Sequence, residues 1–261
     1  METPEVKQCC AAFYGSDLAK MLLGESFHPG GARLTERLGQ LLQLDERSHV
    51  LEVACGRGTS ALHLAERFGC SVLGIDLSAE NIAVAAEEAD RRGLNESVQF
   101  QRGDAELIPV EDTSFDAIVC ECAFCTFPGK PVAALEFHRV LRPGGRVGLS
   151  DLTRTPAPIP ELEGLLAWVA CIADALPAEQ YAAVLQEANF LVESVEDHSE
   201  ALVEMVRQVQ GRLLGAEVLA GLEQLSLPGV DFEAARKFAE AALRATRGGS
   251  LGYLILIARK A

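Results

Sequence analysis

The chain carries, at residues 49–58, the sequence HVLEVACGRG. The apolar run 49–53 is short enough for a buried strand, and the glycines after it lead into a helical segment at 58–68. Glycine permits a positive φ and lets the backbone approach a ligand closely. Glu52 therefore ends a strand where a glycine-rich turn opens a helix, and in an open α/β sheet this crevice is where ligands bind.

Strands and helices alternate after this stretch. Further strands are expected at 71–75, 98–101, 115–120, 146–150, 191–196 and 251–258. Helices are expected at 79–92, 131–141, 161–174 and 178–188, with a proline-rich loop at 153–160. Ser78 is the expected N-cap of helix 79–92. The alternation predicts an α/β fold, a doubly wound, mostly parallel seven-stranded sheet with helices on both faces.

Two helical segments complete the expected domain organisation. Residues 1–45 are expected to form an N-terminal helical flap, interrupted at 28–31 because proline and paired glycines cannot continue a helix. Residues 46–261 are expected to form the main domain. A helical cap is expected within it at about 200–247, broken near 228–229.

The composition excludes several classes of protein. Of the 261 residues 49% are hydrophobic, which suffices to fill a core, so global disorder is excluded. Lys and Arg number 23 against 38 Asp and Glu, giving a formal net charge of −15. This excess of negative charge disfavours nucleic acid and anionic membranes as partners. No secretory signal is visible, and the longest apolar stretch, 251–258, is too short to span a bilayer as a helix. We therefore expect a cytoplasmic protein whose eight cysteines are mostly thiols.

Carboxylates at the strand ends predict a nucleoside site. Asp76 ends the second strand, where a carboxylate can accept the two hydroxyls of a ribose. Asp104 follows the third strand and is placed to accept the exocyclic amine of adenine. Glu52 and its acidic surroundings disfavour a pyrophosphate and hence NAD, and instead suit a cofactor that carries a sulfonium and an ammonium.

These blocks over residues 48–150 resemble the class I S-adenosylmethionine-dependent methyltransferases. The resemblance implies S-adenosylmethionine as the cofactor, with the glycine motif beside its methionine part, Asp76 at the ribose, and Asp104 with Ala105 at the adenine. Phe13 and Tyr14 could close the flap over the cofactor or could serve only in helix packing. The resemblance implies these cofactor-binding residues: Tyr14, Glu52, Ala54, Cys55, Gly56, Gly58, Asp76, Leu77, Asp104, Ala105 and Glu121.

The cysteines bear on the methyl acceptor. Cys120 and Cys122 stand at the end of the fourth strand, and Cys171 lies in a segment that contains Trp168. This pairing resembles the arsenite methyltransferases, which implies that Cys122 and Cys171 bind trivalent arsenic as substrate, with Cys10 as a third thiolate and a thiol reductant as a partner. Arsenic is soft and thiophilic, so thiolates suit it better than carboxylate or imidazole.

Other interpretations of these residues stay open. The thiols could merely pack, with a carbon, oxygen or nitrogen atom of a small organic metabolite as the acceptor. A zinc site using Cys122 and Cys125 would need a second pair, which the adjacent Cys9 and Cys10 would supply poorly; no structural metal is expected. His28 could be a general base at the site mouth or a loop histidine without a role. Hypotheses of other classes are a noncatalytic cofactor-binding module and an NAD-dependent dehydrogenase.

Overall fold

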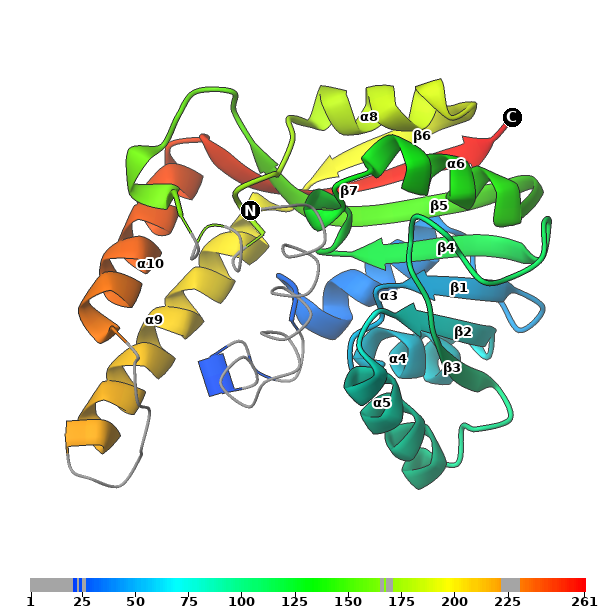
Figure 1. Cartoon of the computed structure of the whole chain (residues 1–261), viewed down its shortest axis with the longest axis horizontal. Coiled ribbons are helices and arrows are strands. Elements are labelled where there is room, and N and C mark those ends of the chain that lie inside the picture. Colours follow the sequence, from blue (N-terminus) through cyan, green and yellow to red (C-terminus); the bar gives the residue numbers. More distant parts are fainter. Residues whose placement is uncertain (1–20, 23, 25–26, 165–166, 168–170, 222–230) are drawn as a thin grey trace.

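A computed structural model describes residues 21–22, 24, 27–164, 167, 171–221 and 231–261. Seven strands form one sheet in the order β3-β2-β1-β4-β5-β7-β6 (Figure 1). Its first five strands pair in parallel, whereas β7 runs antiparallel to both β5 and β6. The strands are β1 (His49–Val53), β2 (Ser71–Asp76), β3 (Val98–Arg102), β4 (Phe115–Glu121), β5 (Leu141–Arg154), β6 (Phe190–Asp197) and β7 (Leu251–Lys260). The predicted doubly wound α/β fold is confirmed.

Helices cover both faces of the sheet (Figure 1). One face carries α3, α4 and α5, and the other carries α6 and α8. The helices around the sheet are α3 (Gly31–Leu41), α4 (Thr59–Phe68), α5 (Ala79–Arg92), α6 (Lys130–Val140) and α8 (Ala178–Glu187). Between β6 and β7 the chain forms α9 (Ser199–Gly221) and α10 (Phe232–Arg247), which pack on each other and project beyond the carboxyl ends of the central strands (Figure 1).

The sequence explains the local geometry of the central units. In β1 the four residues after His49 are buried, as expected for a middle strand covered on both faces. Helix α4 lies between two glycines in the left-handed region, Gly58 at its N-cap and Gly69 at its C-cap. Helix α5 has the predicted cap, in which the Ser78 side chain accepts a hydrogen bond from the Asn81 backbone N–H. These short turns place the strand ends and the helix starts along one edge of the sheet.

Three predicted elements differ from the structure. The fifth strand was expected at 146–150, but β5 extends over Leu141–Arg154 because Leu141 already pairs with Phe115 and Thr153 still pairs with β7. This extension shortens the predicted loop at 153–160. The helix expected at 161–174 is confirmed at residue 167 only, since a 3-10 turn covers Pro160–Leu162 and turns follow from 171.

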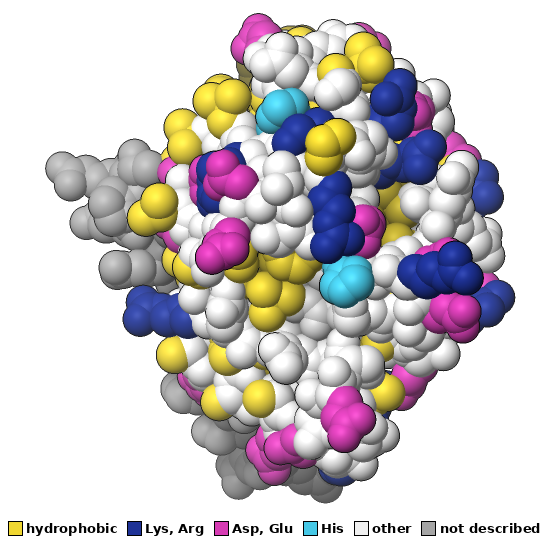
Figure 2. All heavy atoms as spheres, turned by 90° about the vertical axis from the view of Figure 1, so that its right-hand side faces the viewer, with side chains coloured by type: hydrophobic (Ala, Val, Ile, Leu, Met, Phe, Trp, Pro, Cys, Tyr) yellow, Lys and Arg dark blue, Asp and Glu magenta, His cyan; other side chains and the backbone are white. Residues whose placement is uncertain are grey.

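The surface agrees with the scattered charges of the sequence. Figure 2 shows Lys and Arg side chains interspersed with Asp and Glu over the face at the right of Figure 1. No helix in the described part of the chain is both long and apolar enough to cross a bilayer.

Candidate active site

The described residues enclose a pocket of about 160 Å³ at the carboxyl ends of β1, β2 and β4. Ten residues predicted from the sequence line it: Glu52, Ala54, Cys55, Gly56, Asp76, Leu77, Asp104, Ala105, Glu121 and Cys122. Gly58 and Cys171 were also predicted at the site but are not among the lining residues. Cys10, Phe13, Tyr14 and Trp168 lie outside the described residues.

The glycine turn after β1 is fixed by the neighbouring strand. The Gly56 backbone N–H donates to Asp76 Oδ2 at 2.9 Å, and the Cys55 N–H donates to the Ile75 carbonyl at 2.9 Å. Gly56 has φ +53°, and a Cβ added there would meet nothing within 4 Å, so its Cα faces open space. Gly58 has φ +78°, but a Cβ there would lie 2.5 Å from the Phe100 ring. Gly58 therefore makes room for core packing beside the pocket.

The nucleoside end of the pocket is built from β2 and the turn after β3. Asp76 is 9% exposed, and its Oδ1 accepts the Ser78 backbone N–H at 2.8 Å and the Asn81 amide at 3.4 Å. Asp104 Oδ1 accepts the Glu106 backbone N–H at 3.0 Å. Asp76 thus orders the glycine turn in addition to facing the pocket, a second role that the sequence did not predict.

Glu52 is a buried carboxylate with an unused acceptor. Glu52 is 4% exposed, and its Oε2 has no hydrogen-bond partner among the described residues. Burial raises the pKa of Glu52 well above its usual range, and the nearby Glu121 and Asp76 carboxylates raise it further. A cation in the pocket would supply the missing partner and stabilise the ionised form.

Glu121 is held by side chains from three other elements. The Thr35 hydroxyl donates to Glu121 Oε2 at 3.0 Å, and the Ser150 hydroxyl donates to Oε1 at 3.3 Å. The Tyr253 hydroxyl in turn donates to Ser150 Oγ at 3.0 Å. His28 Nε2 lies 3.5 Å from Oε2, with side-chain exposures of 7% for His28 and 3% for Glu121. The network fixes both oxygens of Glu121 at the pocket wall.

S-adenosylmethionine fits this donor and acceptor set. The orphaned Glu52 oxygen and the adjacent Glu121 favour a cationic ligand, and the open space above Gly56 admits a ligand against the backbone. The carboxylates Asp76 and Asp104 supply the hydrogen-bond acceptors that a ribose and an adenine amine require. When bound, this cofactor supplies an electrophilic methyl group on a sulfonium.

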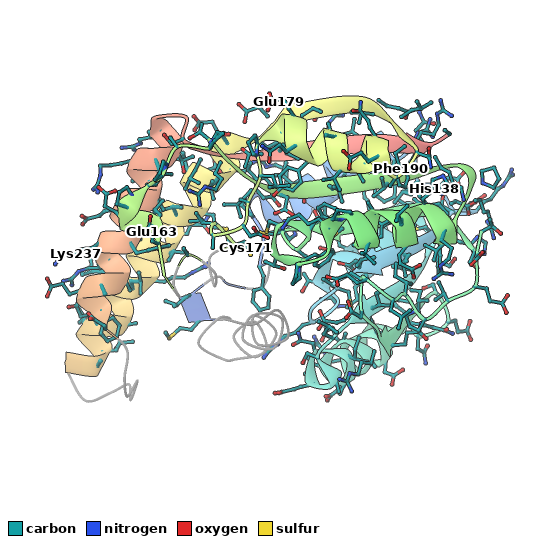
Figure 3. All side chains as sticks on the ribbon, turned by 45° about the horizontal axis from the view of Figure 1, so that its top comes forward. His138, Glu163, Cys171, Glu179, Phe190 and Lys237 are labelled. Atoms are coloured by element: carbon teal, nitrogen blue, oxygen red, sulfur yellow. The ribbon has the colours of Figure 1, made fainter. Side chains whose placement is uncertain are left out.

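The structure brings three thiols together next to the pocket. Cys171 Sγ donates to the Cys122 carbonyl oxygen at 3.6 Å, and its thiol also hydrogen-bonds the thiols of Cys122 and Cys125. Figure 3 places Cys171 between the sheet and the α9–α10 pair. Cys122 has φ +51° and Cys171 has φ +60°, backbone conformations that residues other than glycine rarely adopt. In a continued strand, Cys120 and Cys122 would lie on the same face. Strand β4 ends at Glu121, so this arrangement is not formed.

Asp151 interacts with two of these cysteines, Cys125 and Cys171. It is fully buried and accepts the backbone N–H groups of Cys125 and Leu152, each at 2.8 Å. Burial raises the pKa of Asp151 to about 7. The hydrogen bond with the Cys171 thiol, and then burial, raise the pKa of Cys122 well above the usual range. Burial, and then the same thiol, raise the pKa of Cys125 likewise, and the Asp151 charge adds to both effects. Cys122 and Cys125 are therefore neutral thiols at physiological pH.

The second pair of the zinc alternative, Cys9 and Cys10, lies outside the described residues. Among the residues that the structure describes, no three His, Cys, Asp or Glu side chains converge so as to hold a metal ion. The cysteines 55, 70, 120, 122, 125 and 171 are all free thiols, in agreement with the sequence-based expectation.

Several site residues were missed or left undecided at the level of sequence. Thr35 and Ser150 carry no motif, and their roles arise from helix α3 and strand β5 meeting at Glu121. Asp151 directly follows the strand expected at 146–150, but it was not predicted as a site residue. His28 was left between two interpretations, and the structure places it in the pocket wall rather than in a solvated loop.

Comparison with known proteins relates the chain to the methyltransferases. A family model described as a methyltransferase domain matches residues 50–145. The 27-O-demethylrifamycin SV methyltransferase of Amycolatopsis mediterranei is 29% identical over 267 residues, covering 94% of this chain and 93% of that protein. The O-methyltransferase cnsE of Penicillium expansum is 30% identical over 191 residues, 72% of this chain and 69% of that protein. The chain spans half of a Haemophilus influenzae protein that it matches at 39% identity over 126 residues.

Solved structures share the whole fold. The [4+2]-cyclase SpnF superposes with a TM-score of 0.78 at 25% identity, over 98% of this chain and 96% of that one. Phosphoethanolamine N-methyltransferase 2 of Haemonchus contortus, in complex with S-adenosylhomocysteine, gives a TM-score of 0.81 at 19% identity, over 98% of this chain and 60% of that one. The similarity to a cyclase means that fold alone does not decide the reaction.

Proposed function

Because the chain belongs to the S-adenosylmethionine-dependent methyltransferases, we propose that it transfers the cofactor's methyl group to a small molecule, and that this acceptor is trivalent arsenic held by Cys122 and Cys171. The observation that carries the proposal is the contact between these two thiols, one of which lines the pocket. We further propose a cytoplasmic location, with a thiol reductant as the partner and neither nucleic acid nor membrane.

Neutral thiols can bind arsenous acid without burying a new charge. Each cysteine S–H exchanges with one As–OH, so that an S–As bond forms and the hydroxide leaves as water with the thiol proton. Two exchanges would hold arsenic between Cys122 and Cys171, leaving the third position for hydroxide or an external thiol. The raised thiol pKa values therefore do not oppose binding, although they would oppose a site that required free thiolates.

The acceptor needs no general base in this scheme. Arsenic keeps a lone pair, which forms the new As–C bond while the cofactor's sulfur retains the electrons of the bond that breaks. Arsenic is thereby oxidised from the trivalent to the pentavalent level, so another round requires two electrons from a thiol reductant. The contribution of the chain is to hold the nucleophile beside the pocket, a proximity effect.

The test compares four cysteine variants with the wild type. Cys122→Ser, Cys171→Ser and the double variant should each lose most arsenite binding and methylation, and the double variant little more than either single one, because the two thiols act as a unit. Binding of S-adenosylhomocysteine, measured by calorimetry, should survive in all three. Cys70→Ser is the control, since this buried thiol donates to the Leu64 carbonyl remote from the pocket.

Mass spectrometry of the product after incubation with arsenite, thiol and labelled cofactor gives the second readout. Arsenite binding that persists in the double variant would overturn the arsenic proposal while leaving the cofactor site intact.

An organic hydroxyl is the second candidate acceptor. His28 and Glu121 are buried side by side in the pocket wall, an arrangement suited to accepting a proton from a hydroxyl nucleophile. Two of the relatives are a 27-O-demethylrifamycin SV methyltransferase and an O-methyltransferase. A panel of hydroxylated acceptors that are methylated by the Cys122→Ser and Cys171→Ser double variant as well as by the wild type would favour this candidate. Cofactor binding with no product from any acceptor would favour a noncatalytic module.

A further inference from the structure

We propose that Glu121 recognises the positive charge of the cofactor's sulfonium, so that the pocket binds S-adenosylmethionine more tightly than the product S-adenosylhomocysteine. The two molecules share the adenosine and the ammonium of their methionine part, and differ at sulfur, which is a cationic sulfonium in one and a neutral thioether in the other. The inference rests on the proposed function, because the position of the sulfonium is argued from an acceptor on the thiol side of the pocket.

The sheet order sets the positions of the pocket carboxylates. Because β3, β2, β1 and β4 are neighbours in that order, Asp104, Asp76, Glu52 and Glu121 follow one another along the carboxyl edge. A cofactor with its nucleoside at Asp76 and Asp104 therefore has its methionine part directed toward β4. Cys122, the next residue after Glu121, lines the pocket on the side of the thiols. Methyl transfer requires the sulfonium to face the acceptor, which brings it to the β4 end.

Two buried carboxylates, Glu52 and Glu121, lie at this end of the pocket, and S-adenosylmethionine carries two cationic groups, the ammonium and the sulfonium. Glu52 has the unpartnered oxygen and lies between Asp76 and Glu121, both of which interact with it electrostatically. We assign Glu52 to the ammonium, which both ligands carry, and Glu121 to the sulfonium, which only one carries. In the described part of the chain, the ion-pair partner of Glu121 is His28 at 3.5 Å, and no Lys or Arg pairs with it.

The hydrogen-bond network around Glu121 fixes the orientation of its carboxylate. Hydroxyls from Thr35 and Ser150 contact one oxygen each, and the Tyr253 hydroxyl supports Ser150. Such preorganised hydrogen bonds hold the carboxylate in one orientation, without reorganisation when the ligand arrives. A cation near a buried carboxylate interacts more strongly than it would in water, so the loss of one charge on sulfur should be felt in affinity.

The experiment measures the ratio of two affinities, with no acceptor present. Calorimetry on the full chain gives the dissociation constants of S-adenosylmethionine, S-adenosylhomocysteine and sinefungin, which carries an amine where the sulfonium stands. Glu121→Gln should lower the preference for S-adenosylmethionine over S-adenosylhomocysteine by about tenfold, equivalent to about 1.4 kcal/mol. The preference for sinefungin should fall with it. Gln keeps the size of the side chain, and the hydroxyls of Thr35 and Ser150 can each donate or accept.

Matched variants separate charge recognition from general binding. Glu52→Gln and Asp76→Asn should weaken all three ligands by similar factors and leave the ratio unchanged. Glu121→Asp keeps the charge and should retain more of the preference than Glu121→Gln. Should Glu121→Gln prove unfolded by circular dichroism, Thr35→Val, which removes one donor to the carboxylate, provides the same test with a smaller fall in the ratio.

An unchanged ratio in Glu121→Gln and in Thr35→Val would overturn the proposal, as would a fall confined to Glu52→Gln, which would assign the sulfonium to that residue. Since no methyl acceptor is present, these outcomes are independent of whether arsenic is the substrate.

Discussion

Substitution of three glycines by alanine separates the contribution of each to binding and to stability. Gly56, Gly58 and Gly93 all have positive φ, at +53°, +78° and +69°, so an alanine at any of them meets the same backbone penalty, about 1–2 kcal/mol. A Cβ at Gly56 or Gly93 meets nothing within 4 Å, whereas at Gly58 it would lie 2.5 Å from the Phe100 ring and 2.9 Å from Ala85 Cβ. Overpacking should add about 1–3 kcal/mol at that position.

The expected pattern is therefore different for each variant. Gly93→Ala, at the C-cap of α5 and away from the pocket, should lose only the backbone term and keep cofactor affinity. Gly56→Ala should lose a similar amount of stability but bind S-adenosylhomocysteine at least tenfold more weakly, because its methyl group enters the pocket. Gly58→Ala should be the least stable of the three, and its folded fraction should bind almost normally.

Urea denaturation followed by circular dichroism gives the free energy of unfolding, and calorimetry gives the affinity. If Gly58→Ala is no less stable than Gly93→Ala, the argument from the Phe100 contact is wrong. If Gly56→Ala binds S-adenosylhomocysteine like the wild type, the turn after β1 does not cradle the cofactor.

Three further predictions follow from the same geometry. Asp76→Ala should weaken S-adenosylhomocysteine binding by about 2–3 kcal/mol in calorimetry, because it removes a ribose acceptor and frees the Gly56 N–H; unchanged affinity would exclude this role. Asp151→Asn should flatten the pH dependence of the free energy of unfolding. The folded pKa of about 7 exceeds the usual 3.8, so the stability from this group is full at low pH and is lost as pH rises through 7, by up to about 4 kcal/mol. Urea titrations between pH 4 and 9 in which the free energy of unfolding changes equally with pH in both proteins would contradict this prediction. Cys122→Gly should cost about 1–2 kcal/mol less stability than Cys120→Gly in urea denaturation, because glycine relieves the left-handed backbone only at 122, and equal losses would show that this backbone is not strained.

The parts of the fold that the sequence predicted are those governed by local patterns. Runs of four to eight residues mark the strands, and Gly58 and Ser78 mark the starts of α4 and α5, so the sheet and the carboxyl edge follow. The pocket was predictable for the same reason: its carboxylates directly follow strands, and parallel strands end at one edge. The start of β5 was not, because Pro143, Gly144 and Gly145 normally end a regular segment. That strand continues because Leu141 pairs with Phe115 across an irregular register.

The parts that were missed depend on contacts between distant segments. Glu121 is oriented by Thr35 from α3 and Ser150 from β5, positions 86 and 29 residues away in the chain, and neither belongs to a local motif. Cys125 was considered only as a zinc ligand. It joins the thiol cluster because a 3-10 turn at Phe124–Thr126 returns the chain toward Asp151, which the alternation of β5 alone does not reveal.

The backbone of the thiol pair argues against packing as its only role. Buried cysteines that merely fill space need no particular backbone, yet Cys122 and Cys171 both adopt the left-handed region, where a side chain is strained. Other contacts hold the segment that carries Cys171: buried Lys130 pairs with Asp174, and the Arg154 guanidinium donates to the carbonyls of residues 172 and 173. Backbone strain at two thiols in mutual contact, one of them in the wall of the cofactor pocket, is the reason for which we propose a chemical use of the sulfur atoms.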